Sequence, residues 1–207
     1  MPDAPVPYFL ARPSGSPPWP GVVVCQEGNG ISQQLLRVCE RLAGEGYVVA
    51  APDLFHHLGG PHQERAMEQY PVLKFEDALR DIRDVVAQLR AAGADKIGVT
   101  GFCMGGLMTY LTATSDIDVQ AAVPFYGGRI AQNLGEPTCP TLLLFGGTDE
   151  YIPTEDIEAV QAHHGDQVVV YPQAGHGFFR DGSENYDEAA ATDAWDRLTR
   201  HFAAHLR

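Results

Sequence analysis

Short apolar runs recur along the chain and are separated by longer stretches in which apolar and polar residues are mixed. The runs are rich in valine, leucine and alanine, and runs of this kind are typical of strands buried on both faces of a sheet. They occupy residues 21–26, 47–51, 96–100, 121–126, 141–145 and 167–171. Glycine or proline follows each run within two residues, so each is predicted to end in a loop.

The stretches between these runs predict helices. In residues 75–92 the apolar positions recur at the spacing of one helix face. This stripe consists of Ala78, Ile82, Val85, Val86 and Leu89. Ser32 is placed to cap a helix that continues to about Glu45. Further helices are predicted over residues 64–70, 107–114, 153–164 and 186–205.

The alternation of strands and helices indicates the fold class. Parallel strands need a crossover between them, and the crossover helices cover both faces of the sheet. We therefore expect an α/β fold with a mostly parallel central sheet and helices on both faces. The proline-rich residues 1–20 are expected to form an extended strand or loop over this body. With 207 residues and no repeat or linker, the chain is predicted to be a single domain, residues 1–207.

The stretch Gly101-Phe102-Cys103-Met104-Gly105-Gly106 joins a predicted strand to a predicted helix. A strand that enters a helix through a tight turn flanked by glycines is the context of a nucleophile elbow. Gly101 and Gly105 stand two residues before and after Cys103, where a side chain would clash as the backbone turns. The turn would expose the thiol at the start of a helix, where the dipole and free N–H groups favour a thiolate. The alternative is a buried structural cysteine, which is the commoner role of a free cysteine.

Two further residues complete a catalytic pattern at the ends of predicted strands. Asp149 follows the run 141–145, and His176 lies in the loop after the run 167–171. Functional residues of open α/β sheets gather at the carboxyl ends of strands, and the order nucleophile, acid, histidine is that of α/β-hydrolases. His176 would take the thiol proton of Cys103, and Asp149 would orient the imidazole. Taken singly, Asp149 would more simply cap the next helix and His176 would be a loop histidine, but their joint placement favours catalysis.

The formal net charge of −13 argues against nucleic acid and anionic membrane surfaces as partners. No apolar run is long enough to span a bilayer, and the N-terminus lacks the pattern of a signal peptide. The four cysteines lack CxxC spacing, which indicates neither a disulfide framework nor a zinc site and favours a cytoplasmic protein with reduced thiols. His56, His57 and His62 have no acidic partner at metal-binding spacing, so we interpret them as loop histidines and expect no metal and no cofactor.

The chain resembles the dienelactone hydrolase family of α/β-hydrolases over nearly its whole length. The matching motifs are Gln26-Glu27, Pro52-Asp53-Leu54, Gly101-Phe102-Cys103-Met104-Gly105-Gly106, Gly146-Gly147-Thr148-Asp149 and Ala174-Gly175-His176-Gly177-Phe178. The resemblance implies the α/β-hydrolase fold and hydrolysis of a small ester or lactone without a cofactor. It also implies that Glu27 contacts the nucleophile and accepts the thiol proton when substrate binds. The N–H groups of Gly28 and Met104 would form the oxyanion hole.

The resemblance further implies arginines that hold a carboxylate of the substrate. Arg180 matches one such position, Arg65 the other, and Tyr70 corresponds to the aromatic residues of the pocket. The leading hypothesis is a carboxylic-ester hydrolase, monomeric or a small homo-oligomer, that opens a small lactone or ester through an acyl-thioester on Cys103. Two alternatives stay open: a general carboxylesterase or thioesterase without carboxylate preference, and a non-catalytic redox-sensing relative. An activated exposed thiol oxidises readily, but sensing does not need a base, an acid and a glutamate as well.

Overall fold

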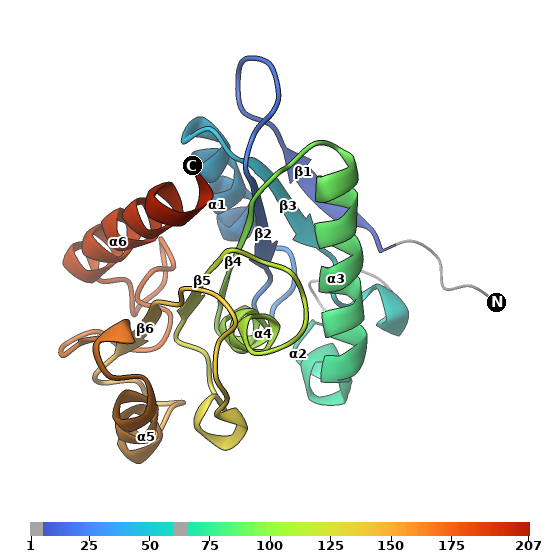
Figure 1. The fold of residues 1–207 in the computed structure, drawn as a ribbon. Coiled ribbons are helices and arrows are strands. Elements are labelled where there is room, and N and C mark those ends of the chain that lie inside the picture. Colours follow the sequence, from blue (N-terminus) through green and yellow to red (C-terminus); the bar gives the residue numbers. More distant parts are fainter. Residues whose placement is uncertain (1–5, 60–65) are drawn as a thin grey trace.

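The computed structural model describes residues 6–59 and 66–207, and its centre is a seven-stranded sheet. The strands are β1 (Tyr8–Ala11), β2 (Gly21–Cys25), β3 (Val48–Pro52), β4 (Ile97–Phe102), β5 (Ala121–Phe125), β6 (Leu143–Gly146) and β7 (Val168–Tyr171). Their order across the sheet is β1-β3-β2-β4-β5-β6-β7 (Figure 1). β1 runs antiparallel to β3, and the other neighbouring strands are parallel. The predicted α/β fold with a mostly parallel sheet is confirmed.

Helices cover both faces of this sheet. They are α1 (Gln33–Gly44), α2 (Ala66–Gln69), α3 (Phe75–Ala91), α4 (Met104–Ala113), α5 (Thr154–His164) and α6 (Glu188–Leu206), with short 3-10 turns η1 (His56–Leu58), η3 (Tyr70–Val72), η4 (Ala131–Asn133) and η5 (Gly165–Gln167). α1 and α6 share one face, where the guanidinium of Arg41 lies 3.8 Å from the centre of the Trp195 ring. α3 and α4 pack against each other and against the sheet on the other face (Figure 1).

The helix boundaries follow local capping. Ser32 caps α1 as predicted, because its hydroxyl accepts a hydrogen bond from the Leu35 N–H at 3.2 Å. α6 begins at Glu188 rather than at the predicted residue 186, because the Asp187 carboxylate accepts from the Ala190 N–H at 2.9 Å and so occupies the N-cap position. α4 begins at Met104 rather than at Leu107, since the chain enters the helix directly after Cys103.

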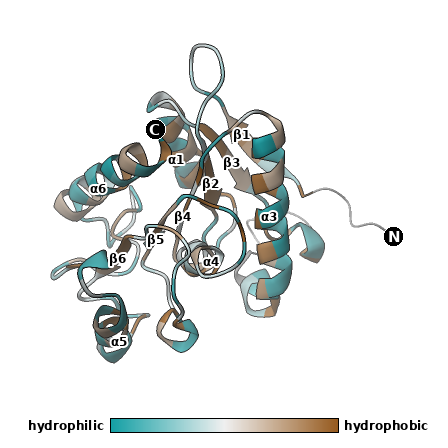
Figure 2. Cartoon of the chain, in the orientation of Figure 1, coloured by the Kyte–Doolittle hydropathy of each residue, from teal (hydrophilic) through white to brown (hydrophobic). Residues whose placement is uncertain are grey.

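The core lies between the central strands and the inner helix faces. Every residue of β2, β3, β4 and β5 is buried. Figure 2 shows these apolar strands in the interior and polar residues along the outer faces of α3 and α6. α4 is buried on almost all sides, because Gly106 lets it approach the sheet closely: a Cβ at this position would lie 2.2 Å from the Phe125 carbonyl oxygen. None of the helices in the described part of the chain is long and apolar enough to cross a membrane.

The parallel strands bring the predicted site residues to one edge of the sheet. Glu27 follows β2 and Cys103 follows β4, and the register pairs Cys25 with Gly101. Glu27 and Cys103 therefore occupy equivalent positions, each two residues beyond that pair. Asp149 follows β6 and His176 follows β7, the next strand in the sheet. The carboxyl edge is where α/β sheets assemble their sites.

Candidate active site

Cys103 sits at a strained turn between β4 and α4. Its φ of 55° and ψ of −115° lie in a region that residues other than glycine rarely adopt. Its N–H donates to the Phe125 carbonyl oxygen at 3.1 Å, which fixes the turn against β5. A Cβ at Gly101 would lie 2.4 Å from the Gly105 carbonyl oxygen, and one at Gly105 would lie 2.2 Å from the Cys25 carbonyl oxygen. The two glycines are therefore required, and the turn has the geometry of a nucleophile elbow.

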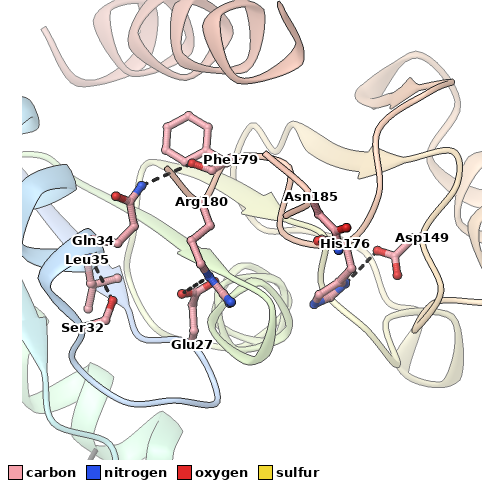
Figure 3. Close-up of polar contacts among 9 residues, drawn as sticks. All are labelled: Glu27, Ser32, Gln34, Leu35, Asp149, His176, Phe179, Arg180 and Asn185. Atoms are coloured by element: carbon pink, nitrogen blue, oxygen red, sulfur yellow. Dashed lines mark hydrogen bonds and ion pairs between the residues drawn. The ribbon is translucent and has the colours of Figure 1, made fainter. Parts of the chain in front are cut away.

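His176 and Asp149 form the second part of the site. The imidazole Nδ1 lies 2.8 Å from Asp149 Oδ2, and the Asp149 side chain is fully buried. The other oxygen of Asp149 accepts from the Tyr151 and Ile152 N–H groups at 2.8 and 3.0 Å. Asp149 thus turns the backbone after β6 and holds the histidine ring with the same carboxylate. Figure 3 shows Asp149 beyond the His176 ring, on the side away from α4.

The charge state of His176 depends on both of its neighbours. Burial disfavours the imidazolium, but hydrogen bonds with Asp149 and Cys103, and the negative charges of these groups, outweigh it and raise the pKa of His176 to about 9. The imidazole of His176 therefore has Asp149 as its hydrogen-bond partner at Nδ1, and the charge of Cys103 acts on the same ring. An imidazole held in this way can exchange a proton with a neighbouring thiol or leaving group.

Glu27 and Arg180 pair with each other across the site. Arg180 Nη2 donates to Glu27 Oε1 at 2.7 Å, and Arg180 Nε donates to Oε2 at 3.2 Å, which makes the pair bidentate (Figure 3). Glu27 is only 3% exposed, so this ion pair compensates a buried charge. Both carboxylate oxygens of Glu27 face Arg180, and the implied proton transfer from Cys103 to Glu27 stays a prediction.

Two backbone N–H groups of the predicted oxyanion hole have no backbone acceptor. Within the described residues, the N–H groups of Gly28 and Met104 donate to no backbone oxygen. Met104 is the first residue of α4, where N–H groups lack helical partners. These positions are consistent with the predicted oxyanion hole, whose role stays a prediction.

Tyr70 lies against the Gly28 side of the site. A Cβ at Gly28 would stand 3.5 Å from the Tyr70 ring. Burial, together with the negative charge of Cys103, raises the pKa of Tyr70. Arg65 and His62 lie outside the described residues, so the structure does not place the second predicted arginine.

Tyr126 and Arg129 are residues of this edge that the sequence pattern did not indicate. Tyr126 has a φ of 35° and is 1% exposed, and its ring centre lies 5.1 Å from that of His176. Burial, with the nearby charge of Glu27, raises the pKa of Tyr126 well above its usual range. Arg129 has a φ of 66°, and its guanidinium lies 5.0 Å from the Phe75 ring centre. The glycines that follow Tyr126 in the sequence signal a turn there, but not the side chains that it presents.

Comparisons with known proteins show which family the chain is similar to. The model of the "Dienelactone hydrolase family" matches residues 6–206. The "Putative carboxymethylenebutenolidase" of Salmonella typhimurium is 34% identical over 227 residues, covering 97% of this chain and 83% of that protein. The "Carboxymethylenebutenolidase" of Pseudomonas putida is 30% identical over 204 residues, covering 88% and 86%. A crystal structure of a "Putative Dienelactone Hydrolase" from Klebsiella pneumoniae superposes with a TM-score of 0.86 at 30% identity, covering 97% and 93%.

Proposed function

The chain belongs to the dienelactone hydrolase family and is a hydrolase of ester or lactone bonds, and from this premise we propose that Cys103 is its nucleophile. The observation that carries the proposal is the 2.8 Å hydrogen bond between His176 and Asp149 at the carboxyl edge of the sheet, together with the effect of Cys103 on the same imidazole. The strained turn at Cys103 supports it, because such a turn holds a side chain away from the body of its helix. The reaction then proceeds in two steps through an acyl-thioester.

In the first step the thiolate of Cys103 attacks the carbonyl carbon of the ester. The carbon–sulfur bond forms while the carbonyl oxygen becomes an oxyanion, which the N–H groups of Gly28 and Met104 bind. Loss of one such donor typically costs about 2.7–4 kcal/mol of transition-state stabilisation. The carbon–oxygen bond to the leaving group breaks, and the His176 imidazolium gives its proton to the departing alkoxide. With a lactone, the alcohol stays attached to the acyl group.

In the second step water replaces the sulfur. Neutral His176 takes a proton from a water molecule as that water attacks the thioester carbonyl. The carbon–sulfur bond breaks, and the carboxylic acid leaves a thiolate beside an imidazolium, as at the start. Asp149 keeps the ring in one tautomer throughout, with Nδ1–H toward its carboxylate and Nε2 toward the sulfur. Glu27 is proposed as an auxiliary base for the thiol, a role that requires its pair with Arg180 to open.

The Glu27–Arg180 pair favours a second candidate, a general carboxylesterase or thioesterase without carboxylate preference. Two of the N–H donors of Arg180 already form hydrogen bonds with Glu27, and the net charge of the pair is zero. A substrate carboxylate therefore meets no uncompensated arginine at this position. Gly177, which follows His176, also presents no side-chain donor to an anion.

The nucleophile is tested with Cys103→Ala and an activated neutral ester, p-nitrophenyl acetate. We expect kcat/KM to fall by at least about a thousandfold, because the remaining groups form no covalent intermediate. Mass spectrometry of wild-type protein quenched during turnover should find the acyl group on the peptide that contains Cys103. Cys139→Ala is the matched control, since Cys139 is also a partly exposed free thiol but lies outside the site.

Retention of most of the rate in Cys103→Ala would exclude the thiol as nucleophile. Absence of ester turnover in the wild type, with stable sulfenate formation on Cys103, would instead favour the redox-sensing alternative.

A further inference from the structure

Two neighbouring histidines meet a buried carboxylate on the side of the sheet near β3. His56 and His57 belong to η1, just after β3, and Asp81 lies on α3. The Nε2 atoms of His56 and His57 lie 3.1 and 3.2 Å from the same oxygen, Asp81 Oδ1. The expectation that these histidines lack an acidic partner is therefore wrong for His56 and His57. The partner comes from another element, 24 residues beyond His57, and chain spacing does not reveal it.

The potential ligand atoms of these three residues lie close to one another. His56 Nε2 lies within hydrogen-bond distance of Asp81 Oδ1, but it is buried and forms no hydrogen bond with any described residue. The potential ligand atoms of His56, His57 and Asp81 all lie within 4.8 Å of one another. Ligand atoms about 2.0–2.2 Å from a tetrahedral metal ion stand about 3.2–3.6 Å apart, close to the two measured nitrogen–oxygen distances.

The electrostatic surroundings favour a cation. The Asp81 side chain is 4% exposed, and its Oδ2 has no hydrogen-bond partner among the described residues. Asp53 is 3% exposed, its Oδ2 is likewise unpartnered within the described chain, and its charge acts on both histidines. A buried carboxylate oxygen without a hydrogen-bond partner is costly, and a bound cation offsets that cost.

We propose that His56, His57 and Asp81 bind one divalent transition-metal ion, and that zinc is the ion these ligands fit best. Two imidazoles and one carboxylate are a common zinc ligand set and leave one coordination position for water. The ion would connect η1 to α3. η1 also contacts the residue before Tyr70, because Gln69 Nε2 donates to the Leu58 carbonyl oxygen at 3.1 Å. The site is distinct from Cys103, His176 and Asp149 and needs no part in the ester chemistry.

The test is metal binding by the full chain after dialysis against a chelator. Titration with Zn²⁺ in a calorimeter should give one ion per chain, and Co²⁺ should produce the visible absorption of a low-symmetry site. His57→Gln and Asp81→Asn should each weaken Zn²⁺ binding by at least about tenfold. Zn²⁺ should raise the Tm of the wild type more than the Tm of His57→Gln at the same Zn²⁺ concentration.

His205→Gln is the matched control, because His201 and His205 form another close histidine pair, with ring centres 4.7 Å apart on α6. Binding that is lost in His205→Gln and kept in His57→Gln would overturn the proposal. So would the absence of saturable Zn²⁺ binding by the wild type. Asp81 is buried and its replacement can impair folding, whereas the His57 side chain is 28% exposed. His57→Gln, with an unchanged circular dichroism spectrum, therefore decides the result.

Discussion

At the scale of single residues, backbone strain gathers where the proposed chemistry occurs. Cys103, Tyr126 and Arg129 combine side chains with positive φ values of 55°, 35° and 66°. Cys103 follows β4, and the other two follow β5, the neighbouring strand. Such conformations cost free energy and persist only where the surroundings enforce them, so they mark positions at which a side chain must point in one direction.

Asp149→Asn tests how the carboxylate sets the charge of His176. In the wild type, kcat/KM should fall as the pH rises through about 9, because the raised pKa of His176 keeps the proton for the leaving group up to that value. The asparagine has no negative charge, so the pKa of His176 should drop and the alkaline limb should move to lower pH by about one unit or more. A pH profile measured with a neutral ester would report the shift.

The same substitution should change the pH dependence of folding. The pKa of His176 is raised from 6.5 to about 9, so its protonation stabilises the folded state fully below pH 6.5, and that contribution is lost as the pH rises through 9. Asp149→Asn should reduce this loss of folding stability between pH 6.5 and 9. Asp166→Asn, an exposed carboxylate outside the site, is the control. If the alkaline limb of the kcat/KM profile stays at the same pH in Asp149→Asn, a group other than His176 controls that limb.

At the scale of elements, helix α1 begins beside the site. Ser32 caps it, and Gln34 in its first turn donates to the Phe179 carbonyl oxygen at 3.3 Å (Figure 3). Phe179 precedes Arg180, so the first turn of α1 helps to place the loop that carries the Glu27–Arg180 pair. α5, by contrast, begins at Thr154, and its N-cap residue Pro153 provides no side-chain cap.

Ser32→Ala should lower the free energy of unfolding by about 1 kcal/mol, because the Leu35 N–H loses its acceptor. Urea denaturation followed by circular dichroism would measure this change. Ser16→Ala, at an exposed loop position, should change the free energy of unfolding by less than about 0.5 kcal/mol. Equal effects of the two substitutions would mean that the cap contributes nothing to stability.

The strands and the strand-end positions were predictable, whereas the pairing of side chains between elements was not. Continuous apolar runs in the sequence indicate the buried parallel strands. Glycines two residues before and after Cys103 indicate the tight turn between β4 and α4. The Glu27–Arg180 pair joins residues 153 positions apart, and Asp81 reaches η1 from another helix. Such contacts depend on the rotation of each helix and on side-chain rotamers, which no local pattern encodes. The glycines after Tyr126 signal a turn, but the positive φ values of Tyr126 and Arg129 depend on tertiary contacts and were not predicted.

At the scale of the whole molecule, the net charge of −13 opposes the approach of anions. The field of a strongly acidic protein lowers the encounter rate of a negatively charged substrate, and salt screens that field. Because Arg180 is paired with Glu27, its positive charge does little to offset this repulsion of anionic substrates.

The ratio of kcat/KM for an anionic ester to that for a neutral ester of the same size should rise with salt. Between about 0.01 and about 0.1 M salt the Debye length shrinks from about 30 to about 10 Å, so the repulsion weakens over that range. Steady-state kinetics with matched esters at several salt concentrations would measure the ratio. A ratio that falls as salt is added would instead reveal an attracting cation near Cys103, with Arg129 or Arg180 as the residues to replace.

The turn that carries Cys103 is fixed by main-chain atoms: the carbonyl oxygens of Phe125, Gly105 and Cys25, packed around two glycines. None of these contacts involves the sulfur. The Oγ atom introduced by Cys103→Ser should therefore point in the same direction as the cysteine Sγ, on an unaltered backbone. The two versions of the protein would differ in acidity, size and polarisability of a single atom, so their rates would compare sulfur with oxygen at constant geometry.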